Sequence, residues 1–443
     1  MTLTLDALRG CFEGVVPSTM ATADADGTPN VSYLSQVQLV DASHVALSYQ
    51  FFNKTHRNLQ ENPQSMLAVI DPHSGAHYRL TMRYLRTETA GPLFESMKAR
   101  LAGIASHVGM ASVFKLLGSD VFQVLRIDQV PGEVAPVAAP ARNLMAALRA
   151  ICERSRHQYE QFDLEQLLGA MLAALKDELD IGHAMVLLHD APGERLYTVA
   201  SIGYAASGIG SEIRVGDGVI GVAARERTPI RISHMSAEYS YSAAIRANSP
   251  GSITDIEIPF PGLADACSQL AVPLLAGPRL AGVLYVESPR PMRFNGDDED
   301  LLVALGVQLA LSIDMLRACE EEPAPAGAPE APRQAGGEPV LVRHFPENDS
   351  IFLGDDYLIK GVAGSIFLAL VRDFTDKGRT DFTNRELRLD PRIRLPDIGD
   401  NLEGRLLLLS RRLDERKAGV HIEKTGRGRF HLRLDRPILL AHA

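Results

Sequence analysis

Tryptophan is absent from the 443-residue chain, and cysteine is scarce. The four cysteines, Cys11, Cys152, Cys267 and Cys319, are widely spaced and form no CxxC pair, which excludes a zinc knuckle and a disulfide scaffold. The chain also lacks a long uncharged apolar run, and it does not open on a basic stretch followed by an apolar one. We therefore expect a cytoplasmic protein with no membrane partner, and we assign no residue to a metal.

Charge of one sign does not dominate the composition. There are 45 basic and 55 acidic residues, a net charge of −10, and 46% of residues are hydrophobic, which excludes a disordered chain and a strongly basic nucleic-acid coat protein. The distribution is uneven, however. Residues 340–443 hold 19 basic and 16 acidic residues, and within them residues 401–436 hold ten basic and five acidic ones. The acidic total thus conceals a basic patch near the carboxyl end.

Two segments rich in proline and alanine divide the chain. Residues 131–140 form a short connector, and residues 319–339 form a longer linker with five prolines and nothing to bury. We predict domains at 1–130, 141–318 and 340–443, and a multidomain α+β fold.

The first block reads as short strands at close spacing, which is typical of a small barrel. Asp26-Gly27 is a hairpin turn signal, and Lys54, Thr55 and Arg57 place two cations and a hydroxyl just before a short helix. Such a group suits a phosphate monoester, although Lys54 and Arg57 could equally be a solvated helix start. Further strands are expected at 37–40, 44–49, 65–70, 78–88 and 121–127, and a second helix at 91–103.

The hairpin and the segment Lys54-x-x-Arg57-Asn58-Leu59-x-x-Asn62-Pro63 resemble the pyridoxamine 5′-phosphate oxidase-like FMN-binding split barrel. The resemblance implies an FMN cofactor, with Lys54, Thr55 and Arg57 on its phosphate. It places Asn30, Ser32, Ser35, Ser48 and Gln50 along the ring or the ribityl chain. No catalytic residue is assigned.

The second block alternates helical stripes with strand runs. Leucines recur at helical spacing from Leu164 to Leu179, and the glycine-rich run 215–223 is followed by strand runs at 268–274 and 280–288. This order resembles a GAF domain over nearly all of 141–318, with an α/β sandwich fold. The resemblance implies a small-molecule pocket and a homodimer paired through the flanking helices. Tyr239, Tyr241, Phe260 and Cys267 are candidate pocket residues, although the two tyrosines could be ordinary loop or core aromatics.

The third block reads as helices followed by a β-hairpin with a basic tip. Thr383, with Glu386 three residues on, can cap one of these helices, and Asn295 can cap the last helix of the second block. Its arginine-rich helix and its Gly426-x-Gly428-x-Phe430-x-Leu432 hairpin resemble the winged-helix effector domain of bacterial response regulators. The resemblance implies DNA binding by residues of the helix and the wing: Arg405, Arg411, Arg412, Arg416, Lys424, Arg427 and Arg429. Leu407 and Leu408 make the helix unusually apolar, so it could instead bind protein. Burial of the arginine-bearing face inside the fold would contradict the DNA prediction.

Together these features predict a sensor and transcriptional regulator in which flavin-type and GAF modules control a DNA-binding winged helix. The alternative is a flavin-dependent oxidoreductase with a regulatory GAF domain and a partner-binding C-terminal domain. A third possibility is a signalling scaffold whose last block binds protein.

Overall fold

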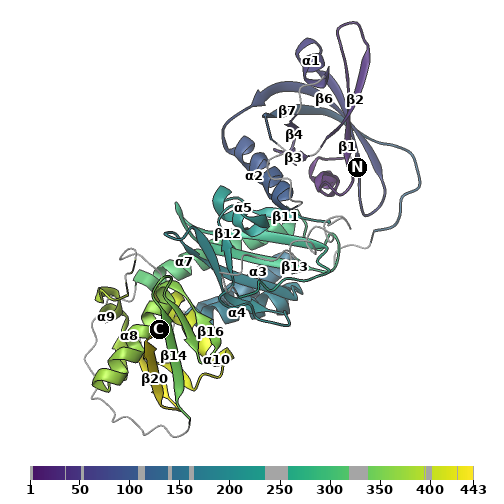
Figure 1. Cartoon of the computed structure of the whole chain (residues 1–443). Coiled ribbons are helices and arrows are strands. Elements are labelled where there is room, and N and C mark those ends of the chain that lie inside the picture. Colours follow the sequence, from purple (N-terminus) through teal and green to yellow (C-terminus); the bar gives the residue numbers. More distant parts are fainter. Residues whose placement is uncertain are drawn as a thin grey trace.

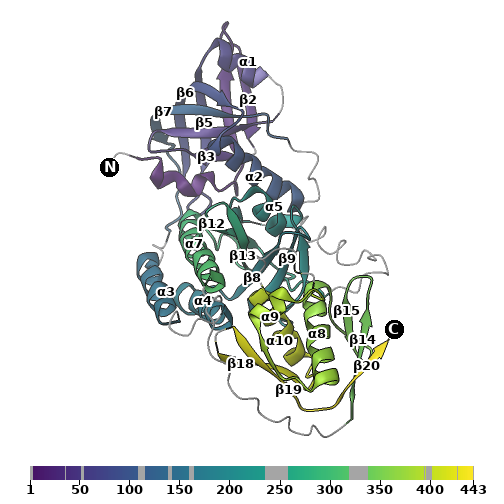
Figure 2. The same cartoon turned by 90° about the vertical axis from the view of Figure 1, so that its left-hand side faces the viewer.

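The computed structural model describes residues 3–34, 36–50, 54–107, 115–137, 142–158, 164–234, 258–318, 338–393, 395, 402–426 and 428–442. Three domains follow one another in space as they do in the sequence, with the second domain in the middle (Figures 1 and 2). No helix of the described residues is both long and apolar enough to cross a membrane.

The N-terminal domain is a curled antiparallel sheet in the order β2-β1-β5-β6-β7-β4-β3. Hairpin β1–β2 turns at Asp26-Gly27, where Gly27 has a φ of +80°, as the turn signal predicts. Apolar side chains from the strands and from η1 close the core. The elements are η1 (Asp6–Phe12), β1 (Ser18–Ala23), β2 (Pro29–Leu34), β3 (Val37–Leu39), β4 (His44–Tyr49), α1 (Lys54–Glu61), β5 (Gln64–Ile70), β6 (His77–Glu88), α2 (Pro92–His107) and β7 (Gly118–Gln129).

The middle domain has a sheet in the order β10-β9-β8-β13-β12-β11. Helix α7 lies along β12 and β13, and α4 packs on β8 and β9. Asn295 caps α7, because its side-chain oxygen accepts from the Asp298 amide at 3.0 Å. The elements are α3 (Leu144–Gln158), α4 (Leu164–Leu179), β8 (His183–Asp190), β9 (Arg195–Ile202), β10 (Glu212–Arg214), α5 (Gly218–Glu226), β11 (Ile230–Ile232), β12 (Ser268–Ala276), β13 (Arg279–Ser288) and α7 (Gly296–Ala318).

The C-terminal domain combines helices with two small sheets, β16-β15-β14-β20 and β17-β19-β18. Thr383 and Glu386 form the expected capping box at the start of α9. The parallel pairing of β14 with β20 was not expected from the sequence. The elements are β14 (Val340–Phe345), β15 (Ser350–Leu353), β16 (Asp356–Ile359), α8 (Gly361–Lys377), β17 (Asp381–Thr383), α9 (Asn384–Leu389), α10 (Leu402–Glu415), β18 (Val420–Gly426), β19 (Arg429–Leu434) and β20 (Ile438–His442).

The middle and C-terminal domains share one hydrophobic core. A single cluster of buried side chains runs from α3 and α4 through the middle sheet to α8 and α10. The C-terminal domain is therefore packed on the middle domain, and the sequence had suggested only a linker between them. The helices and the hairpin β18–β19 have the predicted order, while the winged-helix assignment itself stays a prediction. The predicted linker spans residues 319–339, and residues 319–337 of it lie outside the described residues.

Candidate functional sites

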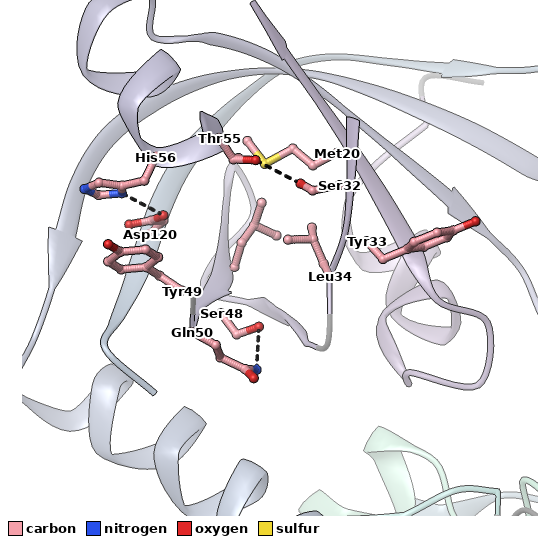
Figure 3. Close-up of a pocket in the computed structure, with 11 residues that line it drawn as sticks. Met20, Ser32, Tyr33, Leu34, Ser48, Tyr49, Gln50, Thr55, His56 and Asp120 are labelled. Atoms are coloured by element: carbon pink, nitrogen blue, oxygen red, sulfur yellow. Dashed lines mark hydrogen bonds and ion pairs between the residues drawn. The ribbon is translucent and has the colours of Figure 1, made fainter. Parts of the chain in front are cut away.

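The first candidate site is a cavity of about 90 Å³ between β2, the end of β4 and the start of α1 (Figure 3). Asn30 donates through Nδ2 to the Thr55 hydroxyl at 2.8 Å, and that hydroxyl donates to Ser32 Oγ at 3.1 Å. Across the cavity Gln50 Nε2 donates to Ser48 Oγ at 3.4 Å. The structure thus gathers these predicted residues around one space.

The two predicted phosphate cations lie at the edge of this group. Lys54 begins α1 and its ammonium lies 3.5 Å from an oxygen of Asp24, while Arg57 is exposed one turn along the helix. A hydroxyl, an ammonium and a guanidinium near the start of a helix are the donors that a phosphate prefers. Ser35 lies outside the described residues.

Three residues of this site escaped the sequence prediction. The rings of Tyr49 and His56 stack with centroids 4.3 Å apart, and His56 Nδ1 lies 3.6 Å from Asp120 Oδ2. Burial raises the pKa of Asp120, although a hydrogen bond from Thr87 and the nearby His56 act in the opposite direction. Tyr49 precedes the predicted phosphate segment and His56 lies within it, whereas nothing in the sequence around Asp120 marks that residue.

The residues fit the polar end of a flavin and not its rings. The Oε1 atom of Gln50 is buried and has no partner among the described residues, so it can accept a hydrogen bond from a ligand. A cavity of about 90 Å³ has room for a few water-sized groups only. A phosphate or ribityl hydroxyls could enter it, and a three-ring system would have to lie outside. Tyr33, 82% exposed, points away from the other labelled side chains (Figure 3).

The second candidate site is a cavity of about 240 Å³ in the middle domain. Strand β10, the start of α5, the segment 260–263 and strands β12 and β13 line it. Phe260, a candidate pocket residue from the sequence, lines this cavity. Cys267 is a free thiol that does not line it, and Tyr239 and Tyr241 lie outside the described residues.

A carboxylate lies at the base of this second cavity. Glu287 is 2% exposed and accepts from the Leu263 amide at 3.0 Å and from the Tyr285 hydroxyl at 3.1 Å. Burial raises the pKa of Glu287. Gln269 and Tyr285 are also buried polar members of the wall. These residues lie inside the strand motifs that indicated the domain, but the sequence gave no reason to choose them over their neighbours.

The third candidate site, the arginine-rich helix α10, is covered by the middle domain. Arg405 donates to Asp190 Oδ1 at 2.9 Å, and its guanidinium carbon lies 5.9 Å from the centre of the Tyr197 ring. Arg411 donates to the Val199 carbonyl at 2.5 Å and lies 3.3 Å from Glu165 Oε1. Both arginines are therefore bound to protein groups of strands β8 and β9 and helix α4.

The remaining predicted DNA contacts are divided. Arg412 is 5% exposed and donates to the Leu358 carbonyl at 3.1 Å and to Glu415 at 2.9 Å. Arg416 is 40% exposed, 4.0 Å from Asp356, and the exposed Lys424 on the hairpin lies 3.2 Å from Glu403. Arg429 is half-buried and Arg427 lies outside the described residues.

In this arrangement Arg405, Arg411 and Arg412 therefore contact protein groups, and their assignment to DNA stays a prediction. Leu407 and Leu408 are 4% and 7% exposed, so the apolar character that the sequence showed is used in packing. A Cβ on Gly210 of the middle domain would lie 3.6 Å from Leu408, which shows how closely the helix approaches. This contact lies within the chain, so the alternative, in which the helix binds a partner protein, also stays a prediction.

Comparisons with known proteins match the first two domains of the chain separately. The family model described as GAF domain matches residues 163–313, and the one described as pyridoxamine 5′-phosphate oxidase matches residues 4–130. The chain therefore contains a GAF domain and an N-terminal domain like that of pyridoxamine 5′-phosphate oxidase. We refer to the first two domains below as the barrel domain and the GAF domain. No curated protein matches the chain.

Solved structures resemble single parts of the chain. An FMN-binding protein from Syntrophomonas wolfei subsp. wolfei is 20% identical over 29% of this chain and 86% of its own, with a TM-score of 0.26. The GAF domain of an Acinetobacter phosphoenolpyruvate-protein phosphotransferase is 20% identical over 40% of this chain and 96% of its own, with a TM-score of 0.31. Free methionine-R-sulfoxide reductase from Neisseria meningitidis is 19% identical over 42% of this chain and 98% of its own, with a TM-score of 0.31.

Proposed function

We propose that the chain is a cytoplasmic regulator that responds to a small molecule bound in the GAF cavity. One observation carries the proposal: the strand that lines the cavity also contacts the C-terminal domain. Ile213 of β10 faces the cavity, while its neighbour Glu212 lies 3.5 Å from Lys360 Nζ, directly before α8. Arg195 of β9 donates to the same Glu212 carboxylate at 2.6 Å. A ligand that shifts β10 would thus act on the attachment of the C-terminal domain.

The output of this regulator is DNA binding by a winged helix that the GAF domain holds closed. Three helices followed by the hairpin β18–β19, together with the basic balance of residues 401–436, support this assignment. In the docked arrangement Arg405 and Arg411 of α10 are occupied by Asp190, Glu165 and Val199, while Leu358 and Glu415 of its own domain hold Arg412. DNA binding then requires a second conformation in which α10 has left the GAF domain, and a ligand favours it only by binding it more tightly.

The test weakens the GAF side of the contact and leaves α10 unchanged. The full chain with Asp190→Ala and Glu165→Ala should retain duplex DNA at low salt at least about tenfold better than the parent, and lose it as salt rises. Asp177→Ala is the matched control, since Asp177 lies on the same helix as Glu165 and pairs with Arg154. Equal retention by parent and double variant would reject DNA as the output.

We further propose that the barrel domain binds FMN. The match of residues 4–130 and the group formed by Asn30, Ser32 and Thr55 support it. Lys54, Thr55 and Arg57 would hold the phosphate, with Ser48 and Gln50 beside the ribityl chain. Bound flavin would supply a redox centre, which makes a flavin-dependent oxidoreductase the alternative function.

Flavin occupancy and turnover separate these roles. The purified chain should show the yellow flavin absorbance, and Lys54→Ala with Arg57→Ala should remove it. Arg83→Ala is the control, because Arg83 is exposed on β6 and does not line the cavity. Unchanged flavin content in the double variant would refute the phosphate assignment. Reduction by NAD(P)H with turnover would favour the enzyme.

A homodimer through the GAF helices is also part of the proposal. Helix α7 carries Val307, Leu311 and Met315 at intervals of four residues, and they are 42%, 55% and 38% exposed. Such a stripe suits a paired helix. Leu311→Lys should convert a dimer to a monomer in light scattering, whereas a monomeric parent would reject this part.

A further inference from the structure

The GAF cavity carries negative groups and no positive ones among its described residues. Its lining is Ile213, Asp217, Gly218, Val219, Ile220, Phe260, Gly262, Leu263, Gln269, Tyr285 and Glu287. This set holds two carboxylates and contains no lysine, arginine or histidine. A buried carboxylate without a cation costs free energy, which a ligand can recover if it brings the missing charge.

Glu287 has the position that such a ligand needs. Its donors are neutral: the Leu263 amide and the Tyr285 hydroxyl bond one oxygen each, and the buried hydroxyl of Tyr204 also faces the carboxylate. A carboxylate has about four acceptor positions, so these three donors leave room for a further one. Burial, with a smaller effect from the Asp265 carboxylate, raises the pKa of Glu287, which is the direction expected where the charged form lacks a cation.

Gln269 adds a neutral polar group to the wall. It is 6% exposed as a residue and lines the same cavity, and its side-chain amide can both donate to and accept from a ligand there. Asp217, exposed at the start of α5, makes no capping bond with its side chain and lies on the cavity wall as well.

The rest of the wall suits the organic part of a cation. The rings of Phe260 and Tyr285 lie 6.4 Å apart, and Ile213, Val219 and Ile220 add aliphatic surface. Aromatic faces attract organic cations, while aliphatic side chains accept a short carbon chain. A hydrated metal ion would make no use of these five side chains.

We propose that the GAF cavity selects a small organic cation, an ammonium-bearing molecule with a short apolar body. Glu287 pairs with the ammonium group, Gln269 accepts one of its hydrogens, and the aromatic and aliphatic wall holds the carbon chain. This inference rests on the proposed function for the location of the site, and it adds the chemical class of the ligand.

The test compares three probes of one shape on the full chain. We expect n-butylamine to bind in an NMR titration about tenfold more tightly than n-butanol, and butyrate not to bind, because a charge-assisted hydrogen bond exceeds a neutral one by about one factor of ten in affinity. Glu287→Gln should abolish the preference for the amine. Asp300→Asn, a change at a carboxyl that is 70% exposed on α7, should preserve it.

Two further readouts keep the test decisive. Amine binding by the parent should weaken as the pH falls and Glu287 takes up a proton, which checks the role of this carboxyl even if Glu287→Gln fails to fold. Equal affinity for the amine and the alcohol, or preference for butyrate, overturns the inference. Hydrogen exchange of α10 tests the proposed function separately: amine binding without any change at α10 would leave the ligand class standing and reject the regulatory link.

Discussion

The GAF domain meets its two neighbours in different ways. Towards the C-terminal domain the contact is a continuous apolar core, to which Leu407 and Leu408 of α10 belong, with Arg405 and Arg411 bound at its margin. Towards the barrel domain a second apolar cluster forms, to which Ala99 of α2 and Ile220 of α5 belong. There, α2 packs on α5 and β11, and a Cβ on Gly103 would clash with the Ile230 side chain.

The barrel contact also includes a cluster of charges. Arg231 of the GAF domain forms an ion pair with Glu13 and donates to Glu299 at 2.8 Å, and its side chain is only 10% exposed. Arg100 of α2 donates to the same Glu299 at 2.6 Å. Two carboxylates and two guanidiniums thus lie together, and each charge depends on the others for its stability.

The difference shows which contact suits a switch. An apolar core can be lost or gained as a unit and responds little to salt, whereas a buried charge cluster fixes one geometry and tolerates no missing member. We therefore expect the barrel domain to stay attached to the GAF domain while the C-terminal domain is released. The predictions below test this contrast, from the largest effect to the smallest.

Arg231→Ala should have the largest effect on stability. It leaves Glu13 and Glu299 facing each other with one guanidinium, so the free energy of unfolding should fall by about 4 kcal/mol in urea denaturation. Arg225→Ala is the control, because Arg225 is 49% exposed and pairs with its neighbour Glu226. A loss for Arg231→Ala no greater than that of the control would show that the cluster is solvated and would remove the contrast.

Leu408→Ala should come next. It removes buried methyl groups beside Gly210 and opens a cavity in the shared core, at a cost of about 3 kcal/mol. The loss should appear as earlier proteolysis of the C-terminal domain, while the barrel domain stays protected. Leu389→Ala, at a side chain that is 74% exposed on α9, should change stability by no more than about 0.5 kcal/mol. If the barrel domain and the C-terminal domain become sensitive to proteolysis together, the two contacts of the GAF domain are not independent.

Arg405→Ala should have a smaller effect. It breaks one charged hydrogen bond to Asp190 and the contact with the Tyr197 ring, and Asp190 can still reach water, so about 1.5 kcal/mol is expected. Hydrogen exchange of α10 measures the loss. Arg416→Ala, at a half-exposed position 4.0 Å from Asp356, provides the comparison. Identical protection in the two variants would show that the Asp190 contact contributes nothing to docking.

The smallest effect concerns pH and the barrel interior. The pKa of Asp120 is raised above 3.8 by burial, so the folded protein binds a proton more tightly there than the unfolded chain. Stability from this group is complete below pH 3.8 and is lost as the pH rises through the folded pKa. The melting temperature of Asp120→Asn, relative to that of the parent, should therefore increase as the pH rises. An advantage that shrinks with rising pH would mean that His56 compensates the charge.

The sequence predicted much of the fold because its local signals agree with the global arrangement. Asp26-Gly27 specified a hairpin turn, Asn295 and Thr383 specified helix starts, and all three have these roles in the structure. The pairing of Val340 with Ile438 could not be foreseen, since no local pattern links two strands so far apart in the chain.

The sites were predicted less well, for physical reasons. Lys54 and Thr55 follow a recognisable segment, but Asp120 joins them only because β7 pairs with β4. An arginine on α10 looks the same in sequence whether it faces DNA or Asp190, so composition could not decide between them. Leu407 and Leu408 held the only warning, because apolar residues on a helix surface need a protein neighbour.

The pairing of β14 with β20 bears on the order of events during synthesis. Strand β14 leaves the ribosome before β20. Its edge that later pairs with β20 stays open until residues 438–442 have been synthesised. Until then the GAF surface that later receives α10 has no finished partner. A chaperone or a second nascent chain would meet both exposed faces in that interval, and slower translation of the segment from β14 to β20 would lengthen it.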